Sequence, residues 1–168
     1  VIAPKQKEEY DKLFDKDSVI LTKGIDFSNL EFEPKQVSDP IKMVYTGKLI
    51  IGRDRSLSLI ADALGEINKN GTRLEMDIYT TDTLSKKQQL SLNRNGCNVK
   101  GALTQSEVIS VQKEADILVF VEGLENKYKN VARLSFSTKI TDYFQSGKCI
   151  FAIGDKEIAP IDYFNRYD

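Results

Sequence analysis

Residues able to hold a phosphate gather around Lys139, in the C-terminal third of the chain. The pattern predicts a helix over residues 136–146, with Ser137 and Thr138 at its start. Backbone N–H groups at the N-terminus of a helix attract anions, and the ammonium of Lys139 strengthens that attraction. Asp142, one turn further on, can accept hydrogen bonds from sugar hydroxyls. These residues together favour a site for a nucleoside diphosphate and its ribose.

Lys139 is the unusual member of this set. A cation in the first turn of a helix opposes the helix dipole by a few tenths of a kcal/mol or more. A bound anion would reverse the sign of that interaction. The alternative is ordinary helix capping, because Ser and Thr are common at helix starts.

A second cationic motif, residues 46–56, directly follows the first strand of the main domain. Gly47 and a second glycine allow close approach of the backbone, and Lys48, Arg53 and Arg55 supply positive charge for a phosphate. The motif lacks the spacing of a dinucleotide-binding or Walker loop. A solvated turn with surface cations is the alternative.

An acidic loop follows a strongly apolar strand. Glu122 and Glu125 are candidates to face a sugar, but a solvated acidic loop is the favoured interpretation. The aromatic residues are expected in the core rather than stacked on a base: Tyr79, Phe120, Tyr143, Phe144 and Phe151.

Composition limits the classes of function. The 168 residues carry a net charge of −1, with 40% hydrophobic and 29% charged residues, as in an ordinary globular domain. No basic field is present to hold a nucleic acid, and no apolar run is long enough for a membrane span. The sequence also lacks a signal-peptide pattern, which favours a cytoplasmic protein.

The residues that usually bind metals are scarce. The chain has no histidine, which excludes an imidazole base within it, and only two cysteines. We therefore expect no metal and no cofactor. Cys97 and Cys149 are expected to be buried free thiols.

Short apolar runs alternate with helical periods after residue 40, which predicts an α/β fold: a three-layer, Rossmann-like domain whose mostly parallel sheet has helices on both faces. Strands are expected over 41–45, 74–79, 97–99, 116–121 and 149–153. Helices are expected over 57–67, 83–93, 104–115, 136–146 and 157–166, with a capping box from Thr104 to Glu107. Ligands of such sheets bind beyond the carboxyl ends of the strands. The candidate loops are therefore 46–55, 80–83, 101–104, 122–137 and 154–157.

The chain divides near residue 40. Residues 1–40 are predicted to be an inter-domain segment with a helix over 5–15, a short strand over 18–21 and a linker over 22–40. Residues 41–168 form the predicted nucleotide-binding domain. No helix or strand is predicted for the polar segment 122–134.

An ordered set of motifs resembles the C-terminal half of GT-B-fold glycosyltransferases of the "group 1" type, which use nucleotide sugars in bacterial polysaccharide assembly. The resemblance covers roughly residues 41–155. It lies in Val44-Tyr-Thr-Gly-Lys-Leu, Arg55-Ser-Leu-Ser-Leu-Ile-Ala-Asp-Ala-Leu, Gly101-Ala-Leu-Thr, Ala115-Asp-Ile-Leu-Val-Phe-Val and Ser137-Thr-Lys-Ile-Thr-Asp-Tyr-Phe-Gln-Ser-Gly-Lys.

This resemblance implies a UDP- or GDP-linked sugar as donor and no metal. It assigns Lys48 and Arg55 to the donor diphosphate, the amides around Ser137 and Thr138 to a phosphate, and Asp142 to the ribose. The loop Gly101-Ala102-Leu103 would border the base. A glycan or lipid-linked acceptor would bind the other half of the enzyme, the N-terminal domain, which is expected to be absent from this chain. The full-length protein is expected in the cytoplasm, as a possible peripheral protein of the inner membrane.

This chain differs from the family's motif at two positions, and two other protein classes remain as alternative interpretations. Many members have a Glu-x7-Glu pattern, whose first position falls here on Leu134, and whose second is shortened to Asp142. A nucleotide-sugar epimerase of the same fold is one rival. The other is a flavodoxin- or receiver-like interaction domain. A receiver needs an acidic cluster after its first strand, where this chain has Gly47 and Lys48.

Overall fold

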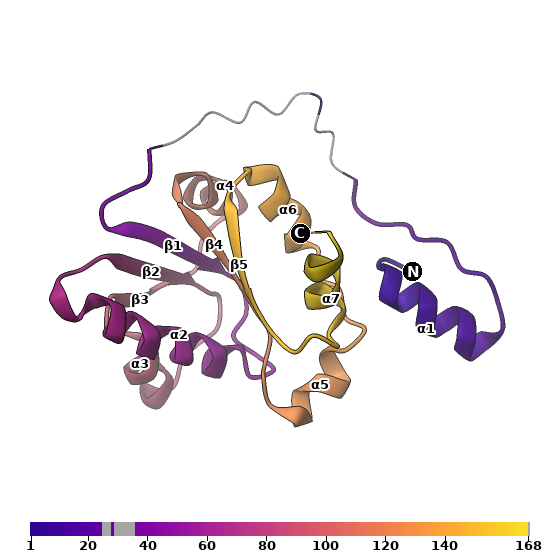
Figure 1. The fold of residues 1–168 in the computed structure, drawn as a ribbon. Coiled ribbons are helices and arrows are strands. Elements are labelled where there is room, and N and C mark those ends of the chain that lie inside the picture. The colour runs from indigo at the N-terminus through magenta and orange to yellow at the C-terminus, as the bar shows by residue number, and fades with distance from the viewer. Residues whose placement is uncertain (25–27, 29–35, 168) are drawn as a thin grey trace.

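A computed structural model describes residues 1–24, 28 and 36–167. Its sheet has five parallel strands in the order β3-β2-β1-β4-β5 (Figure 1). The strands are β1 (Ile41–Thr46), β2 (Leu74–Tyr79), β3 (Cys97–Gly101), β4 (Ile117–Val121) and β5 (Cys149–Ile153). The strand order reverses between β1 and β4, so the carboxyl ends of these two strands form the switch point of the sheet.

Helices cover both faces of the sheet, which confirms the predicted three-layer α/β architecture. One face carries α2 (Arg53–Ile67) and α3 (Lys86–Leu92), and α2 continues into a short 3-10 turn, η1 (Asn68–Asn70). The opposite face carries α4 (Gln105–Glu114), α6 (Lys139–Ser146) and α7 (Ala159–Arg166). Each face buries its own apolar cluster against the sheet.

Local sequence signals account for most of these elements. β4 is a continuous apolar run, and four of its five residues are buried because helices cover both of its faces. The predicted capping box at the start of α4 is present, with the Thr104 side chain accepting from the Glu107 amide. A second capping box, which the sequence analysis did not identify, joins Ser85 and Gln88 at the start of α3.

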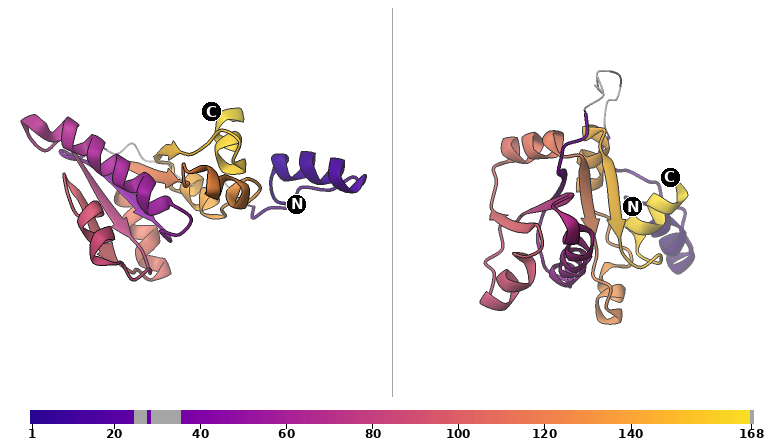
Figure 2. Two further views of the ribbon diagram at one scale, coloured as in Figure 1. Left: turned by 90° about the horizontal axis from the view of Figure 1, so that it is seen from below. Right: turned by 60° about the vertical axis from the view of Figure 1, so that its left-hand side comes forward.

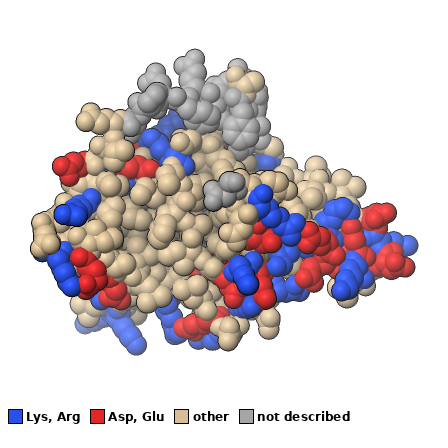
Figure 3. Space-filling view, in the orientation of Figure 1, with Lys and Arg blue, Asp and Glu red and all other residues tan. Residues whose placement is uncertain are grey.

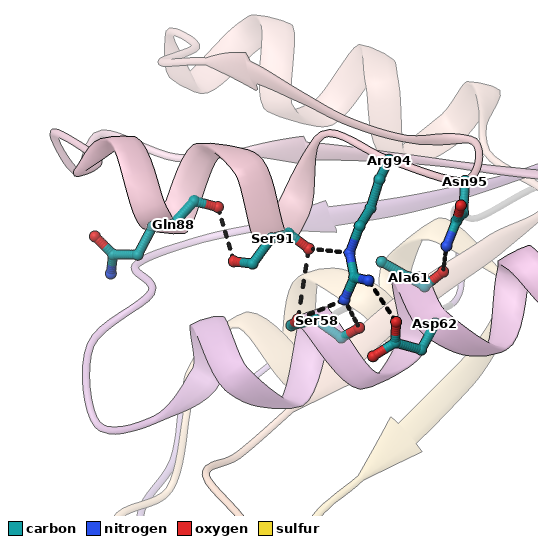
Figure 4. A network of polar contacts seen from close by, with 7 residues as sticks. All are labelled: Ser58, Ala61, Asp62, Gln88, Ser91, Arg94 and Asn95. Carbon is teal, nitrogen blue, oxygen red and sulfur yellow. Dashed lines mark hydrogen bonds and ion pairs between the residues drawn. The ribbon is translucent and has the colours of Figure 1, made fainter.

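A polar network fixes α3 against α2 (Figure 4). Arg94, just beyond α3, pairs with Asp62 of α2 at 2.5 Å and donates to the Ser58 hydroxyl at 3.0 Å. Asn95 donates to the carbonyl of Ala61 at 3.0 Å, again on α2. These contacts hold the middle of α2 against the segment that follows α3, and the position of α2 matters for the site below.

The N-terminal segment lies beside α7 and consists of α1 (Pro4–Phe14) followed by extended chain (Figures 1 and 2). Glu8 of α1 pairs with Arg166 of α7 at 2.6 Å, and Gln6 donates to the carbonyl of Leu134 at 2.5 Å. Figure 3 shows acidic and basic side chains crowded over this end of the molecule. The strand predicted over residues 18–21 is wrong: this stretch joins no sheet, and its backbone bonds go to Val1 and to the side chain of Asp11.

Three further expectations need correction. The segment 122–134 contains a helix, α5 (Asn126–Ala132). Cys97 is buried as expected, but Cys149 is exposed because β5 lies at the edge of the sheet. Phe151, also on β5, is 42% exposed and does not belong to the core. The linker predicted over 22–40 falls largely on residues outside the described part of the chain. No helix among the described residues is long and apolar enough to cross a membrane.

Candidate functional site

The loop between β1 and α2 brings backbone close to the switch point. Gly47 and Gly52 have φ angles of +144° and +76°, which side chains other than glycine rarely adopt. Between them Ile51 has φ +59°, an uncommon and strained conformation for a β-branched residue. Tyr45 donates to the carbonyl of Lys48 at 2.7 Å, and the amide of Leu49 donates to Asp82 at 2.6 Å. The loop is thus held from both its own strand and the β2–α3 loop.

A two-pronged ion pair joins this loop to the end of β4. Arg53, the first residue of α2, donates to both carboxylate oxygens of Glu122, at 2.9 and 3.0 Å. The two side chains are 16% and 3% exposed. The Ser56 hydroxyl donates to the backbone carbonyl of Glu122 at 2.7 Å. This bond fixes the backbone at the end of β4, in addition to the side-chain ion pair. Burial lowers the pKa of Arg53, but the hydrogen bonds and charge of Glu122 outweigh burial and leave that pKa raised.

This ion pair corrects the sequence interpretation of Glu122. A solvated acidic loop was favoured, whereas Glu122 is buried and neutralised by Arg53. Arg53 was recognised as a cation of the glycine motif but was not assigned to the site. Two sequence signals could have identified the pair: a cation directly after the second glycine of the loop, and a carboxylate directly after a fully apolar strand.

Lys139 reaches from the first turn of α6 to the same place. Its Nζ lies 3.4 Å from the carbonyl oxygen of Thr46, the last residue of β1. It also lies 4.6 Å from the ring centroid of Tyr45 and 5.3 Å from that of Phe120. Burial and, to a smaller extent, the charge of Arg53 lower the pKa of Lys139 to about 8, against the opposite effect of Glu122. In residues 1–24, 28 and 36–167, no ion pair to Lys139 is found.

The structure therefore brings some predicted site residues together. Gly47 and Lys139 meet directly, because a Cβ atom built on Gly47 would lie 3.1 Å from the lysine Nζ. Ser137 and Thr138 directly precede α6, with Thr138 at its N-cap position. Their hydroxyls do not cap the helix; the first turn is closed by backbone bonds from Ile140 to Ser137 and from Thr141 to Thr138. The alternative of ordinary side-chain capping is thus not what the structure shows.

Other predicted residues lie elsewhere. The side chain of Lys48 is exposed. Arg55 pairs with Glu125 and lines a separate cavity of about 500 Å³ between α2, α3 and the β4–α5 loop. Asp142 pairs with Lys23 of the N-terminal segment at 2.6 Å, in a cavity of about 250 Å³ between α4 and α6.

The loop predicted to border a base lies beyond β3, two strands from the switch point. Gly101, with φ +93°, accepts from the Thr80 amide at 2.9 Å and is followed by Ala102 and Leu103. No group of three or more acidic or cysteine side chains that could hold a metal occurs among the described residues.

The arrangement at the switch point can hold an anion. It offers one cation already neutralised by a carboxylate, Arg53, and a second, Lys139, for which the described part of the chain supplies no ion-pair partner. The Lys139 ammonium, at the amino-terminal end of α6, packs closely against Gly47, where a Cβ atom would lie 3.1 Å from Nζ. A helix start and a poorly solvated cation together attract a negatively charged group.

Comparisons with known proteins bear on the fold. No protein-family model matches the chain, and no curated protein matches its sequence. A chain in the solved structure described as the GtfA/B complex matches with a TM-score of 0.59 and 14% identity. That match covers 91% of this chain and 29% of the other. The chain thus shares its Rossmann-type α/β fold with part of that chain.

Proposed function

We propose that this chain binds the diphosphate of a nucleotide sugar at the β1–β4 switch point, as the donor-binding part of a glycosyltransferase. One observation carries the proposal: Lys139, from the start of α6, converges with Arg53, from the start of α2, beside Gly47. The glycosyltransferase-like fold supports the choice of a sugar donor rather than another phosphorylated ligand.

The proposed chemistry follows from charge. When the bond between a sugar and a diphosphate breaks, negative charge develops on the departing phosphate oxygen. The Lys139 ammonium and the N–H dipoles of α6 are fixed where they can stabilise that charge without reorganisation. Glu122 holds Arg53 with two hydrogen bonds, so the guanidinium orientation is set before a ligand arrives. The acceptor and the base that deprotonates it are assigned to other parts of a longer enzyme, as this chain spans 29% of the matched one.

Calorimetric titration of the chain with UDP, GDP, uridine and inorganic pyrophosphate tests the proposal. We expect binding of at least one nucleoside diphosphate, no binding of uridine, and weakening by about tenfold or more in Lys139→Met, because a charge-assisted hydrogen bond is lost. The matched control is Lys86→Met, at an exposed lysine of α3, which should bind like the parent chain. Failure of a folded chain to bind UDP and GDP would contradict the proposal, as would equal affinity in Lys139→Met.

Removing Arg53 needs a paired change, because Arg53→Met alone would leave Glu122 buried without a counter-charge. The double variant Arg53→Met/Glu122→Leu replaces the pair with apolar groups, a change that proteins often tolerate. We expect this variant to fold and to bind UDP more weakly than the parent chain. Arg55→Met, two residues away, should bind UDP like the parent because Arg55 pairs with Glu125 outside the switch point.

A further inference from the structure

The segment that follows β4 lies directly against the loop of residues 47–52. A Cβ atom built on Gly123 would overlap with the carbonyl oxygen of Ile51, and one built on Gly52 would lie 3.3 Å from the Cα atom of Gly123. Gly52 has a positive φ angle, whereas Gly123 does not, so the left-handed region does not explain the second glycine. Close approach of two backbones is the physical reason for a glycine at position 123.

Tyr128 of α5 packs its ring on the same two glycines. A Cβ atom on Gly52 would lie 2.6 Å from Cδ2 and Cε2 of this ring, and one on Gly123 would lie 3.1 Å from Cδ2. The Tyr128 amide donates to the carbonyl of Glu125 at 2.9 Å, which fixes the ring in the first turn of α5. The ring thus covers the residue that directly precedes Arg53.

The position of Gly52 determines where α2 begins, and the first residue of α2 is Arg53. The carbonyl oxygen of Gly52 accepts from the amides of Arg55 and Ser56, at 3.1 and 3.2 Å. Arg53 donates to both oxygens of Glu122, and this two-pronged geometry tolerates little displacement of either backbone. A shift of the loop relative to the end of β4 therefore separates the guanidinium from the carboxylate.

We propose that Gly123 and Tyr128 are positioning residues, which fix the orientation of the Arg53 guanidinium at the switch point. Gly123 acts through the carbonyl of Ile51, and Tyr128 acts through the backbone of Gly52. The effect on Arg53 follows from these contacts alone. The consequence for a bound diphosphate rests on the proposed function, in which Arg53 contributes to the anion site.

The side-chain Nε–H of Arg53 reports this orientation without any ligand, because Nε donates to Glu122 at 3.0 Å. In an isotope-labelled chain, its NMR signal should shift in Gly123→Ala and Tyr128→Leu. Its exchange with water should become about tenfold faster, the equivalent of one typical hydrogen bond. Tyr128→Phe keeps the ring and should keep the parent signal. An unchanged signal in both Gly123→Ala and Tyr128→Leu would overturn the proposal, as would an equal change in Tyr128→Phe and Tyr128→Leu.

Gly65→Ala is the matched control for crowding. A Cβ atom on Gly65, towards the other end of α2, would lie 2.6 Å from the side-chain nitrogen of Asn95, so this variant also forces neighbours apart. Whatever its effect on stability, it should leave the Arg53 signal unchanged. Loss of that signal in Gly65→Ala would mean that any disturbance of α2 moves Arg53, which contradicts a specific role of Gly123. If Gly123→Ala does not fold, the two Tyr128 variants, which remove atoms, still decide.

Titration with UDP separates this proposal from the donor site. We expect Gly123→Ala and Tyr128→Leu to bind UDP about tenfold more weakly than the parent chain, and Tyr128→Phe to bind it equally. If the Arg53 signal responds as expected while the parent chain does not bind UDP, the positioning role is supported and the donor site is contradicted. A parent chain that binds UDP while the Arg53 signal is the same in all variants would support the donor site and contradict the positioning role.

Discussion

At the scale of single residues, the site contains two cations in different electrostatic situations. Arg53 is half-buried and fully paired, so its charge is neutralised and its orientation is set by Glu122. Lys139 is half-buried and rests on two aromatic rings, so its charge is available to a ligand. The ion pair with Glu122 therefore gives Arg53 a supporting role. Lys139 is the group whose charge responds to a bound anion and to pH.

The affinity for UDP should fall as pH rises from 7 to 9. The ammonium form of Lys139 binds the anion, and the pKa of about 8 means that most of this form is lost over that range. We expect about a tenfold decrease in affinity, following the fraction of ammonium. Calorimetry at several pH values, in buffers of matched ionic strength, measures it. In Lys139→Arg, whose guanidinium stays charged, the affinity should not change over this range; the same decrease there would assign the titration to another group.

Breaking the buried ion pair on one side should destabilise the fold. Glu122→Gln leaves the half-buried Arg53 guanidinium without its counter-charge, and we expect a loss of about 3 kcal/mol in the free energy of unfolding. Asp62→Asn, which breaks the exposed pair with Arg94, should cost less than about 1 kcal/mol. Urea denaturation of both variants makes the comparison. Equal losses would show that burial of Glu122 has no energetic consequence.

The sequence analysis assigns Arg55 to a diphosphate, whereas the structure has Arg53 at the switch point and Arg55 paired with Glu125 outside it. Arg53 and Arg55 are two residues apart on a helix, so they point to nearly opposite sides of α2. Arg53 lies one turn before the buried Leu57 of α2, so the apolar repeat of the helix indicates its side, but the carboxylates that pair with Arg53 and Arg55 lie far along the chain. Lys139 was identified correctly as unusual, since the helix dipole is a local property.

At the scale of elements, the site depends on the loop of residues 47–52 between β1 and α2. Positive φ angles at Gly47, Ile51 and Gly52 turn the chain sharply, so that α2 begins directly beside the end of β4. The turn places Arg53 beside Glu122 and leaves space at Gly47 for the lysine that reaches in from α6. The site thus takes one residue each from the start of α2, the start of α6 and the positions directly after β1 and β4.

Gly47→Ala should damage both stability and binding. The new Cβ would lie 3.1 Å from Nζ of Lys139 and 3.4 Å from the Tyr45 hydroxyl, at a φ of +144°. We expect a loss of about 1–3 kcal/mol in stability from the backbone strain, together with weaker UDP binding.

Gly71→Ala is the matched control, because Gly71 has φ +121° and open space around its Cβ position. It should lose stability through the same backbone strain and keep UDP binding unchanged. Binding measured at a temperature where both variants are folded separates the two effects. An unaltered affinity in Gly47→Ala would mean that the ligand does not use this loop.

The periodic elements of the sheet and its helices were predictable because each one buries a face with a clear apolar repeat. Helix α2 and strand β2 follow this pattern, whereas β1 and β4 are buried runs and β5, at the edge of the sheet, has no fully buried residue. The helix α5 was missed because its seven residues include two lysines and two asparagines, with one buried residue, Ala132. The strand expected over residues 18–21 has a β-like composition, but it has no neighbouring strand to pair with and its side chains remain exposed.

At the scale of the whole molecule, the parallel sheet acts as a platform whose switch point carries the cations, while the N-terminal segment is attached on the far side of α6 and α7 (Figure 2). That attachment relies on ion pairs: Glu8 with Arg166, Glu9 with Arg133 and Lys23 with Asp142. Leu13 and Phe14 of α1 are 71% and 62% exposed and contribute little buried apolar surface.

Removal of these ion pairs should therefore detach the N-terminal segment from the rest of the molecule without unfolding the sheet. We expect the double variant Arg133→Ala/Arg166→Ala to lose hydrogen-exchange protection in α1, with protection of β1 and β4 unchanged. High salt should act in the same direction on the parent chain, because exposed ion pairs are screened. Lys100→Ala, which breaks an exposed pair with Asp77 on the sheet, is the control and should leave α1 unchanged. Simultaneous loss of protection in α1 and the sheet would contradict this independence.

The central claim concerns where the diphosphate binds, and chemical-shift mapping with isotope-labelled protein tests it most directly. Titration with UDP should shift the backbone amides of Gly47, Lys139 and Ile140 and the side-chain Nε–H of Arg53, all of which lie at the switch point. Shifts confined to the cavity around Asp142 and Lys23, or to the loop at Gly101–Leu103, would contradict the claim.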